Sequence, residues 1–208
     1  YSSMLEGNYS KLNMLTKDEH NFFKKIVHVT QIQELTSQGF WCPLKYERWS
    51  FDESALMLNS TGAEYTNESI KESIVRNGLN NSIYKRLLQL MNERKAILVC
   101  MDSIESCNRI SEFMNARMGA ITGVVTSLTT KKKREQIISD FKEGKLKVVF
   151  NYSTLATGFD FPELDCVMFG RPTFSYSMYY QILGRAVRIH PDKKEALIVD
   201  CCDNMRRF

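Results

Sequence analysis

The sequence predicts an α/β fold, an open and mostly parallel β-sheet with helices on both faces. Two observations predict it. From residue 96 onward, short apolar runs alternate with amphipathic segments of helical period, which is typical of βαβ units. Runs such as AILVCM (Ala96–Met101) also lack polar alternation, as expected of strands that are covered on both faces. The chain of 208 residues, 43% of them hydrophobic, is long enough to bury such a core.

The elements of the first half are expected to be mainly helical. Apolar residues recur at helical spacing after Thr16, and Gly39 ends that run. The weakly alternating stretch LKYERWSF (44–51) predicts a strand, and a loop should follow it up to residue 66. Asn67 is placed to cap a helix that ends near residue 77, and a further helix is expected over about 81–94.

The second half of the chain is expected to repeat strand and helix regularly. Its predicted strands are apolar runs at residues 96–101, 120–125, 147–151, 165–170 and 195–201. Helices should lie between them, starting at Ser103, spanning 131–145, and including QILGRAVR (Gln181–Arg188) before the last strand. Ligands of such sheets bind near the carboxyl ends of the strands, so functional side chains, those of QILGRAVR included, are expected there.

Composition and charge limit the classes of function. The net charge is +4, a mildly basic balance that permits a polyanionic partner but does not require one. None of the six cysteines stands in a CxxC pair, so no zinc or other metal site is expected. Unpaired cysteines beside apolar runs fit a reducing compartment, and the cytoplasm is the predicted location. No apolar run is long enough to span a membrane.

Two stretches carry more polar chemistry than their apolar surroundings require. In QILGRAVR, Arg185 and Arg188 stand three residues apart and Gln181 lies one turn before them, so all three should share a helix face. In STLATGFDFPELDCVMFGRP (153–172), Asp160 is an acid within a largely uncharged segment. An amphipathic helix with a solvated basic edge, and an ordinary connection between strands, are the alternatives that remain open.

The order of these stretches resembles that of superfamily-2 helicases. TGFDFP (157–162), followed about twenty residues later by QILGRAVR, resembles motifs V and VI of that family. AILVCMDSIESCNRISEFM (96–114) resembles its motif IV, and TSLTTKKKREQIISDFKEGKLKVVFN (126–151) resembles the segment between motifs IV and V. The resemblance covers residues 95–202. In addition, FFKKIVHVTQIQELTSQGFWCPL (22–44) resembles the passage between the lobes in the bacterial and phage branch, which includes RadD-like repair helicases and restriction-enzyme translocases. The family resemblance implies a RecA-like fold, namely the C-terminal one of two lobes.

The resemblance implies that ATP lies between the two lobes and that this lobe supplies arginines. Arg185 and Arg188 would be the catalytic residues that reach its phosphates, because a guanidinium stabilises the charge that develops during phosphoryl transfer. Gly158, Asp160 and Gln181 would complete the nucleotide site. For Asp160, a purely structural ion pair is the alternative.

The resemblance also implies a nucleic-acid partner, with DNA favoured. The implied phosphate contacts are hydroxyl groups that follow strands, namely Ser103, Thr126, Thr154 and Thr157. Contacts of this kind carry no information on base sequence. Helix capping is the alternative for each hydroxyl, and many relatives have His where this chain has Thr126. The basic run Lys131–Arg134 is either a solvated helix face or an addition to this track.

The parts of a complete ATPase that bind the phosphates and magnesium are missing from the sequence. It contains no GxxxxGK[ST] loop, and KDEH (17–20) follows no apolar strand, so it is not expected to be a DExH box. The first lobe, with the Mg²⁺ ligands, would lie elsewhere in the same polypeptide. Residues 1–94 are then predicted to be an inter-lobe segment and residues 95–208 the helicase C-terminal lobe, inactive alone. The alternatives are an RNA helicase lobe and a non-catalytic RecA-like module that binds nucleic acid or a partner.

Overall fold

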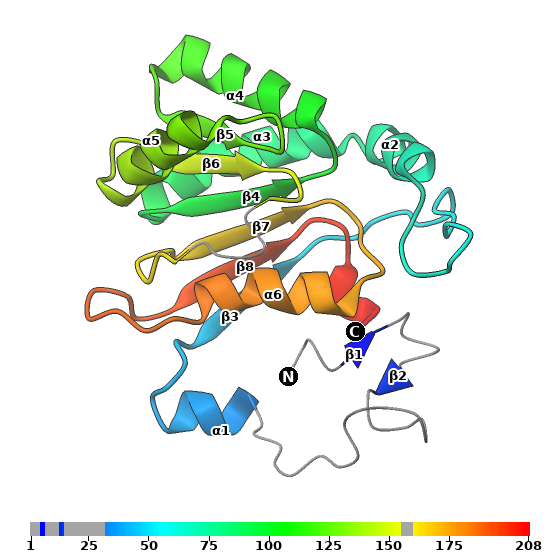
Figure 1. Ribbon diagram of the computed structural model, residues 1–208, viewed down its shortest axis with the longest axis horizontal. Helices are drawn as coiled ribbons and strands as arrows, with labels where there is room; N and C mark the ends of the chain where they lie inside the picture. Colours follow the sequence, from blue (N-terminus) through cyan, green and yellow to red (C-terminus); the bar gives the residue numbers. More distant parts are fainter. Residues whose placement is uncertain (1–4, 7–12, 15–31, 155–159) are drawn as a thin grey trace.

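One large parallel sheet dominates the computed structural model, which describes residues 5–6, 13–14, 32–154 and 160–208 (Figure 1). Its strands run in the order β3-β8-β7-β4-β6-β5, and every neighbouring pair is parallel. In that order they span Leu44–Arg48, Ala196–Asp200, Cys166–Gly170, Ile97–Met101, Val148–Asn151 and Thr122–Val125. The predicted open parallel sheet is therefore confirmed.

Helices cover both faces of this sheet, as predicted. Those on one face are α2 (Asn67–Arg76), α3 (Leu79–Glu93) and α4 (Ile104–Met118). Those on the other face are α5 (Lys131–Lys142) and α6 (Tyr176–Ala186). The other described elements are α1 (Ile32–Ser37), the short antiparallel strands β1 (Leu5–Glu6) and β2 (Asn13–Met14), and the 3-10 helix η3 (Asn204–Arg206).

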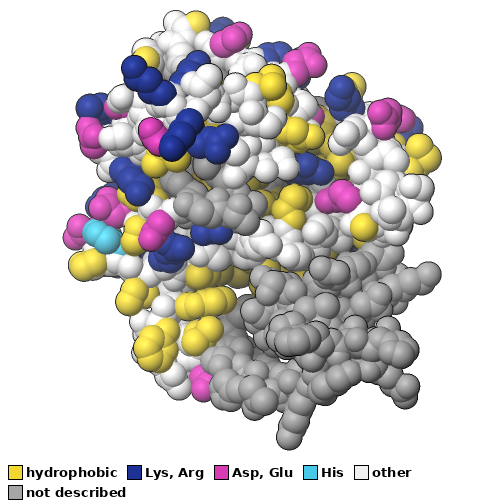
Figure 2. Space-filling view, in the orientation of Figure 1, with side chains coloured by type: hydrophobic (Ala, Val, Ile, Leu, Met, Phe, Trp, Pro, Cys, Tyr) yellow, Lys and Arg dark blue, Asp and Glu magenta, His cyan; other side chains and the backbone are white. Residues whose placement is uncertain are grey.

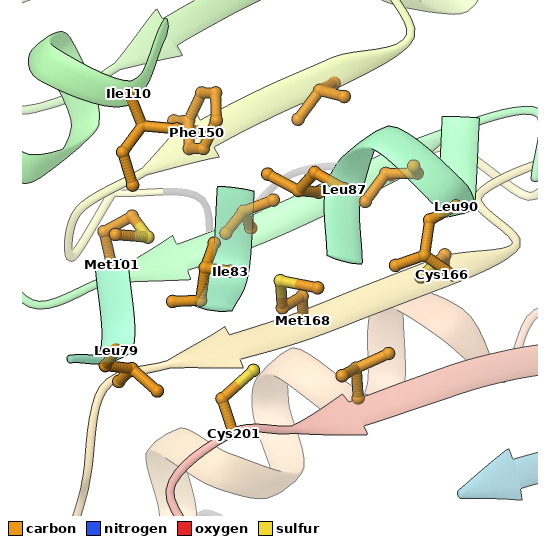
Figure 3. Packing of buried hydrophobic residues seen from close by; sticks show 14 of the residues in the cluster. Leu79, Ile83, Leu87, Leu90, Met101, Ile110, Phe150, Cys166, Met168 and Cys201 are labelled. Carbon is orange, nitrogen blue, oxygen red and sulfur yellow. The ribbon is translucent and has the colours of Figure 1, made fainter. Parts of the chain in front are cut away.

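Strand residues alternate between two buried clusters, because successive side chains of a strand point to opposite faces of the sheet. In β4, Ile97, Val99 and Met101 pack with α2, α3 and α4, and Figure 3 shows this cluster. Leu98 and Cys100 pack with α5 and α6 instead. All five residues are at most 3% exposed. The absence of polar alternation in the sequence thus reflects burial on both faces.

The start of α2 differs from its prediction. Thr66 is the N-cap, and its hydroxyl accepts a hydrogen bond from the backbone N–H of Ser69, whereas Asn67 is the first helical residue. Threonine and asparagine are both good caps, so their order could not be settled by residue type. Most of the helix predicted after Thr16 lies outside the described residues. The glycine that was expected to end it, Gly39, has a φ of 75°, which favours glycine.

The end of α6 also differs from its prediction. The helix ends at Ala186 with Val187 as its C-cap, so Arg188 follows the helix instead of lying on it. Pro191 disfavours helical conformation in the residue before it, which leaves little room for another turn. Arg185 and Arg188 therefore do not share a helix face as the spacing predicted.

Residues before the predicted domain boundary contribute to the same sheet as those after it. β3 pairs in parallel with β8 along its whole length, and α3 packs in the cluster formed with β4. The division into residues 1–94 and 95–208 stays a prediction. Within the described ranges, no helix is long and apolar enough to cross a membrane.

Candidate functional site

The two arginines lie at the end of the sheet where its strands begin, called here the amino end. α6 starts after the last residue of β7 and runs back across the sheet (Figure 1). Its C-cap carbonyl, that of Val187, accepts a 2.8 Å hydrogen bond from the N–H of Cys42, two residues before β3. The expectation that QILGRAVR lies near the carboxyl ends of the strands is wrong, because only the start of a helix that follows a strand lies there.

Arg188 forms an ion pair with Asp160, which links the two stretches singled out in the sequence. The Arg188 guanidinium contacts the Asp160 carboxylate, with side chains 34% and 68% exposed. A pair as exposed as this contributes about 0–1 kcal/mol to stability. The contact therefore brings the two side chains together but contributes little to the stability of the fold. A role of Asp160 in binding a nucleotide stays a prediction, and a purely structural ion pair with Arg188 stays the alternative.

Arg185 lies in the last turn of α6 and is partly buried. Burial lowers the pKa of its guanidinium, which nevertheless stays charged because arginine begins from so high a value. Gln181, one turn earlier, donates from Nε2 to Ser177 Oγ at 3.1 Å. Gly158, the remaining residue predicted for the nucleotide site, lies outside the described residues.

Lys193 is a residue of this site that sequence reasoning missed. Its ammonium donates to three backbone carbonyls, those of Pro162 at 2.6 Å, Leu164 at 3.1 Å and Ala186 at 3.1 Å. The adjacent Lys194 is exposed. In the sequence the two lysines form an unremarkable KK pair after a proline, so no local signal distinguishes them.

The hydroxyl groups predicted to contact nucleic acid lie at the opposite, carboxyl end of the sheet. Ser103 follows β4, Thr126 follows β5 and Thr154 follows β6, so the fold brings these three strand ends to one side. Thr157 lies outside the described residues. Arg185 and Arg188 thus lie at one end of the sheet, and Ser103, Thr126 and Thr154 lie at the other.

Each of these hydroxyl groups already takes part in a local hydrogen bond. Ser103 is the N-cap of α4 and accepts from the N–H of Ser106 at 3.1 Å. The Thr126 hydroxyl accepts from the N–H of Leu128, and Thr154 donates to the carbonyl of Tyr152. The capping role is therefore present for Ser103. A phosphate oxygen accepts, so a hydroxyl needs its one proton for that contact. The Ser103 hydroxyl donates to Ser106 Oγ at 3.0 Å, so Ser103 and Thr154 would each have to exchange their present acceptor for a phosphate.

The basic run stands at the same carboxyl end, in the first turn of α5. Lys131, Lys132 and Lys133 are exposed, and the first turn holds no acidic residue. Figure 2 shows Lys and Arg side chains, with Asp and Glu side chains among them, over the part of the molecule that carries α4 and α5. Cations at the start of a helix oppose its dipole, so these lysines do not serve helix stability. Their placement favours an anionic ligand.

The cysteines and the other possible metal ligands of the described residues form no further candidate site. All six cysteines are free and buried, and no group of three or more His, Cys, Asp or Glu side chains in that part of the chain could hold a metal ion. Burial raises the pKa of the Cys100 thiol to about 12, so it stays protonated near neutral pH.

Known proteins share this sequence pattern. The family of helicase conserved C-terminal domains matches residues 81–190, more than half of the chain. The chain is 27% identical over 177 residues to the protein named "Putative ATP-dependent helicase IRC3" of Saccharomyces cerevisiae. The aligned part covers 85% of this chain and 26% of that protein, so the chain spans about a quarter of its relative.

Solved structures share the fold. An HsdR-subunit fragment of a type I restriction enzyme from Vibrio vulnificus YJ016 has a TM-score of 0.69 at 19% identity, covering 92% of this chain and 38% of that one. The ATP-dependent type ISP restriction-modification enzyme LlaBIII, bound to DNA, has a TM-score of 0.67 at 15% identity, covering 95% and 15%. With the family match over residues 81–190, this sheet and its paired motif residues lead to one conclusion: the chain belongs to the family of helicase conserved C-terminal domains.

Proposed function

We propose that this chain is the second lobe of an ATP-dependent, superfamily-2 DNA helicase or translocase. The observation that carries the proposal is the arginine group at the amino end of the sheet. Arg188 is held by Asp160, and Arg185 lies in the helix turn just before it. Two guanidinium groups on one lobe suit a nucleotide whose phosphates are bound by another lobe, since they stabilise charge as the phosphoryl group leaves.

The rest of the ATP site would come from elsewhere in the complete enzyme. The sequence holds no phosphate-binding loop, and the chain spans about a quarter of the IRC3 relative. The Mg²⁺ ligands and the phosphate loop would belong to the first lobe of the same polypeptide. We therefore propose that the 208-residue chain alone does not hydrolyse ATP. The six free, buried cysteines support a reducing location such as the cytoplasm.

Nucleic acid is the proposed ligand of the carboxyl end of the sheet. The hydroxyl groups after β4, β5 and β6 and the lysines of α5 suit a sugar–phosphate backbone. DNA is proposed because LlaBIII, which shares this fold, is bound to DNA. An RNA helicase lobe has the same backbone contacts and differs in its preference between the two polymers. A non-catalytic module would need no arginine pair, so the arginines support the ATPase over that alternative.

The test is ATP turnover by the complete enzyme with saturating single-stranded DNA. Arg185→Ala is expected to lower kcat by about 10³- to 10⁵-fold, the effect of losing an arginine finger, while DNA affinity changes only a few-fold. Arg185→Lys should recover little, because lysine lacks the planar fork. Arg206→Ala, which removes an exposed arginine, is the matched control. Near-normal turnover by Arg185→Ala would remove this residue from the ATP site, and turnover by the 208-residue chain alone would show that the site is complete without another lobe.

A further inference from the structure

Lys193 ties together the two segments that carry the arginine group. We propose that it is a positioning residue for the Asp160–Arg188 pair, acting on ATP turnover through that pair without touching the nucleotide. The proposal rests on the function proposed above for the arginines. It adds a residue to the site that lies outside both TGFDFP (157–162) and QILGRAVR (181–188).

The geometry around the Lys193 ammonium is complete. Its three acceptors are the carbonyl oxygens of Pro162, Leu164 and Ala186, at 2.6, 3.1 and 3.1 Å. An ammonium carries three donors, so each N–H has its own acceptor. Hydrogen bonds from a charged donor are about twice as strong as those between neutral groups. A compact ammonium fits this arrangement, whereas the fixed fork of a guanidinium does not.

The three carbonyls belong to the segments that place the ion pair. Pro162 and Leu164 follow Asp160 on the path into β7, and Ala186 is the last residue of α6, two positions before Arg188. The carbonyls in the last turn of a helix lack partners within the helix, and a cation there is favourable. Lys193 thus fixes the end of α6 against the segment after Asp160. The distance between the acid and the arginine depends on that junction.

The positive charge of Lys193 is partly buried, which is unfavourable for an ammonium. Burial lowers the pKa of Lys193, nearby Cys42 and Asp165 oppose that effect, and the positive charge of Arg188 lowers the pKa further. An apolar side chain at this position would avoid the desolvation of an ammonium. The carbonyl contacts are therefore what the lysine supplies, and the charge of Arg188 influences the pKa of its ammonium.

The competing explanation is that Lys193 only stabilises the loop. The two explanations differ in whether the effect of a Lys193 substitution on kcat depends on Arg188. Lys193→Met keeps the chain length and apolar stem but removes all three donors. In the complete enzyme with saturating DNA, it should lower kcat for ATP by about 10²-fold, the cost of a small misplacement at a reacting centre, with DNA affinity unchanged. In an Arg188→Ala background, Lys193→Met should have no further effect on kcat. Lys194→Met, at the exposed neighbour, is the matched control and should keep wild-type kcat.

Rescue keeps the test valid if Lys193→Met folds poorly. Lys193→Cys can be treated with 2-bromoethylamine, which alkylates the thiolate with loss of bromide and restores an ammonium on a side chain of lysine's length. Wild-type enzyme treated in the same way corrects for reaction at other cysteines. Treatment should raise kcat of Lys193→Cys at least tenfold and leave kcat of the wild type unchanged.

The outcomes distinguish this proposal from the one on which it rests. Wild-type kcat in Lys193→Met, a full additional loss in the Arg188→Ala background, or failure of the ammonium to restore turnover would each overturn the role of Lys193. In those cases Arg185→Ala and Arg188→Ala would still be impaired, and the proposed function would stand. If both arginine variants turned over ATP normally, the proposed function would fail and the role of Lys193 would fail with it.

Discussion

At the scale of single residues, burial changes the chemistry of the cysteine thiols. Burial raises the pKa of Cys100 and of Cys107 to about 12. At Cys100, a hydrogen bond with Asn151 and the charge of Arg171 offset only part of that effect. Burial also raises the pKa values of Cys201 and Cys202 well above 9.0. Because the thiolate is the reactive species, these cysteines are expected to resist alkylation in the folded chain.

These pKa values make the stability of the chain sensitive to alkaline pH. The unfolded chain releases thiol protons near the ordinary pKa of 9.0, whereas the folded chain keeps them. Stability is therefore fully present below about pH 9 and is lost as the pH rises toward about 12, by at most about 1.4 kcal/mol per thiol and pH unit. Urea unfolding on both sides of pH 9 measures this, and Cys107→Ala should lessen the slope. A flat unfolding midpoint in wild type would contradict the prediction.

Among the elements, α4 combines a structural and a proposed binding role in one side chain. Ser103 caps the helix by accepting from Ser106 N, and it stands at the end of the sheet where nucleic acid is proposed to bind. Aspartate is as good a cap as serine, and its charge suits a helix N-terminus. The same charge would repel a phosphate. Substitution by aspartate therefore separates capping from binding, which substitution by alanine does not.

Ser103→Asp is expected to leave the melting temperature of the chain near its wild-type value and to weaken binding of single-stranded DNA severalfold. Ser103→Ala should cost about 1 kcal/mol of stability through loss of the cap. Thermal unfolding and fluorescence anisotropy with a labelled oligonucleotide provide the two readouts. Thr66→Asp, at the N-cap of α2, is the control and should leave DNA binding unchanged. Equal DNA affinity for Ser103→Asp and wild type would exclude a phosphate contact at this residue.

Elements were predictable where local pattern determines them. The strands Ile97–Met101 and Cys166–Gly170 are buried on both faces, as their unbroken runs of apolar residues predicted. The contact of the α6 C-cap with the segment before β3 is a backbone hydrogen bond between Val187 and Cys42, 145 residues apart in sequence, which no periodicity contains. Lys193 could not be found because its partners are carbonyls, and a carbonyl is present at every residue. The roles of Gly158 and Thr157 stay predictions, since both lie outside the described residues.

At the scale of the whole molecule, the central claim is that one sheet separates two ligands. The arginine group lies at the amino end, beside the starts of β3 and β8, while Ser103, Thr126 and Thr154 lie at the carboxyl end. The lysines of α5 stand with the second group. A sheet covered by helices on both faces is stiff, so events at one end can be passed to the other as a rigid-body movement of the lobe. Substitutions at the two ends should then alter different parameters of one reaction.

A titration of ATP turnover by the complete enzyme with single-stranded DNA tests this claim most directly. Arg185→Ala should lower the plateau rate by at least about 10³-fold without shifting the DNA concentration that gives half-maximal rate. Replacing Lys131, Lys132 and Lys133 with Gln should raise that DNA concentration severalfold at low salt and less at higher salt, because the variant neutralises fewer phosphates, and should leave the plateau within about twofold of wild type. If the lysine variant lowered the plateau, or Arg185→Ala shifted only the DNA dependence, the two ends of the sheet would not have the separate roles assigned to them.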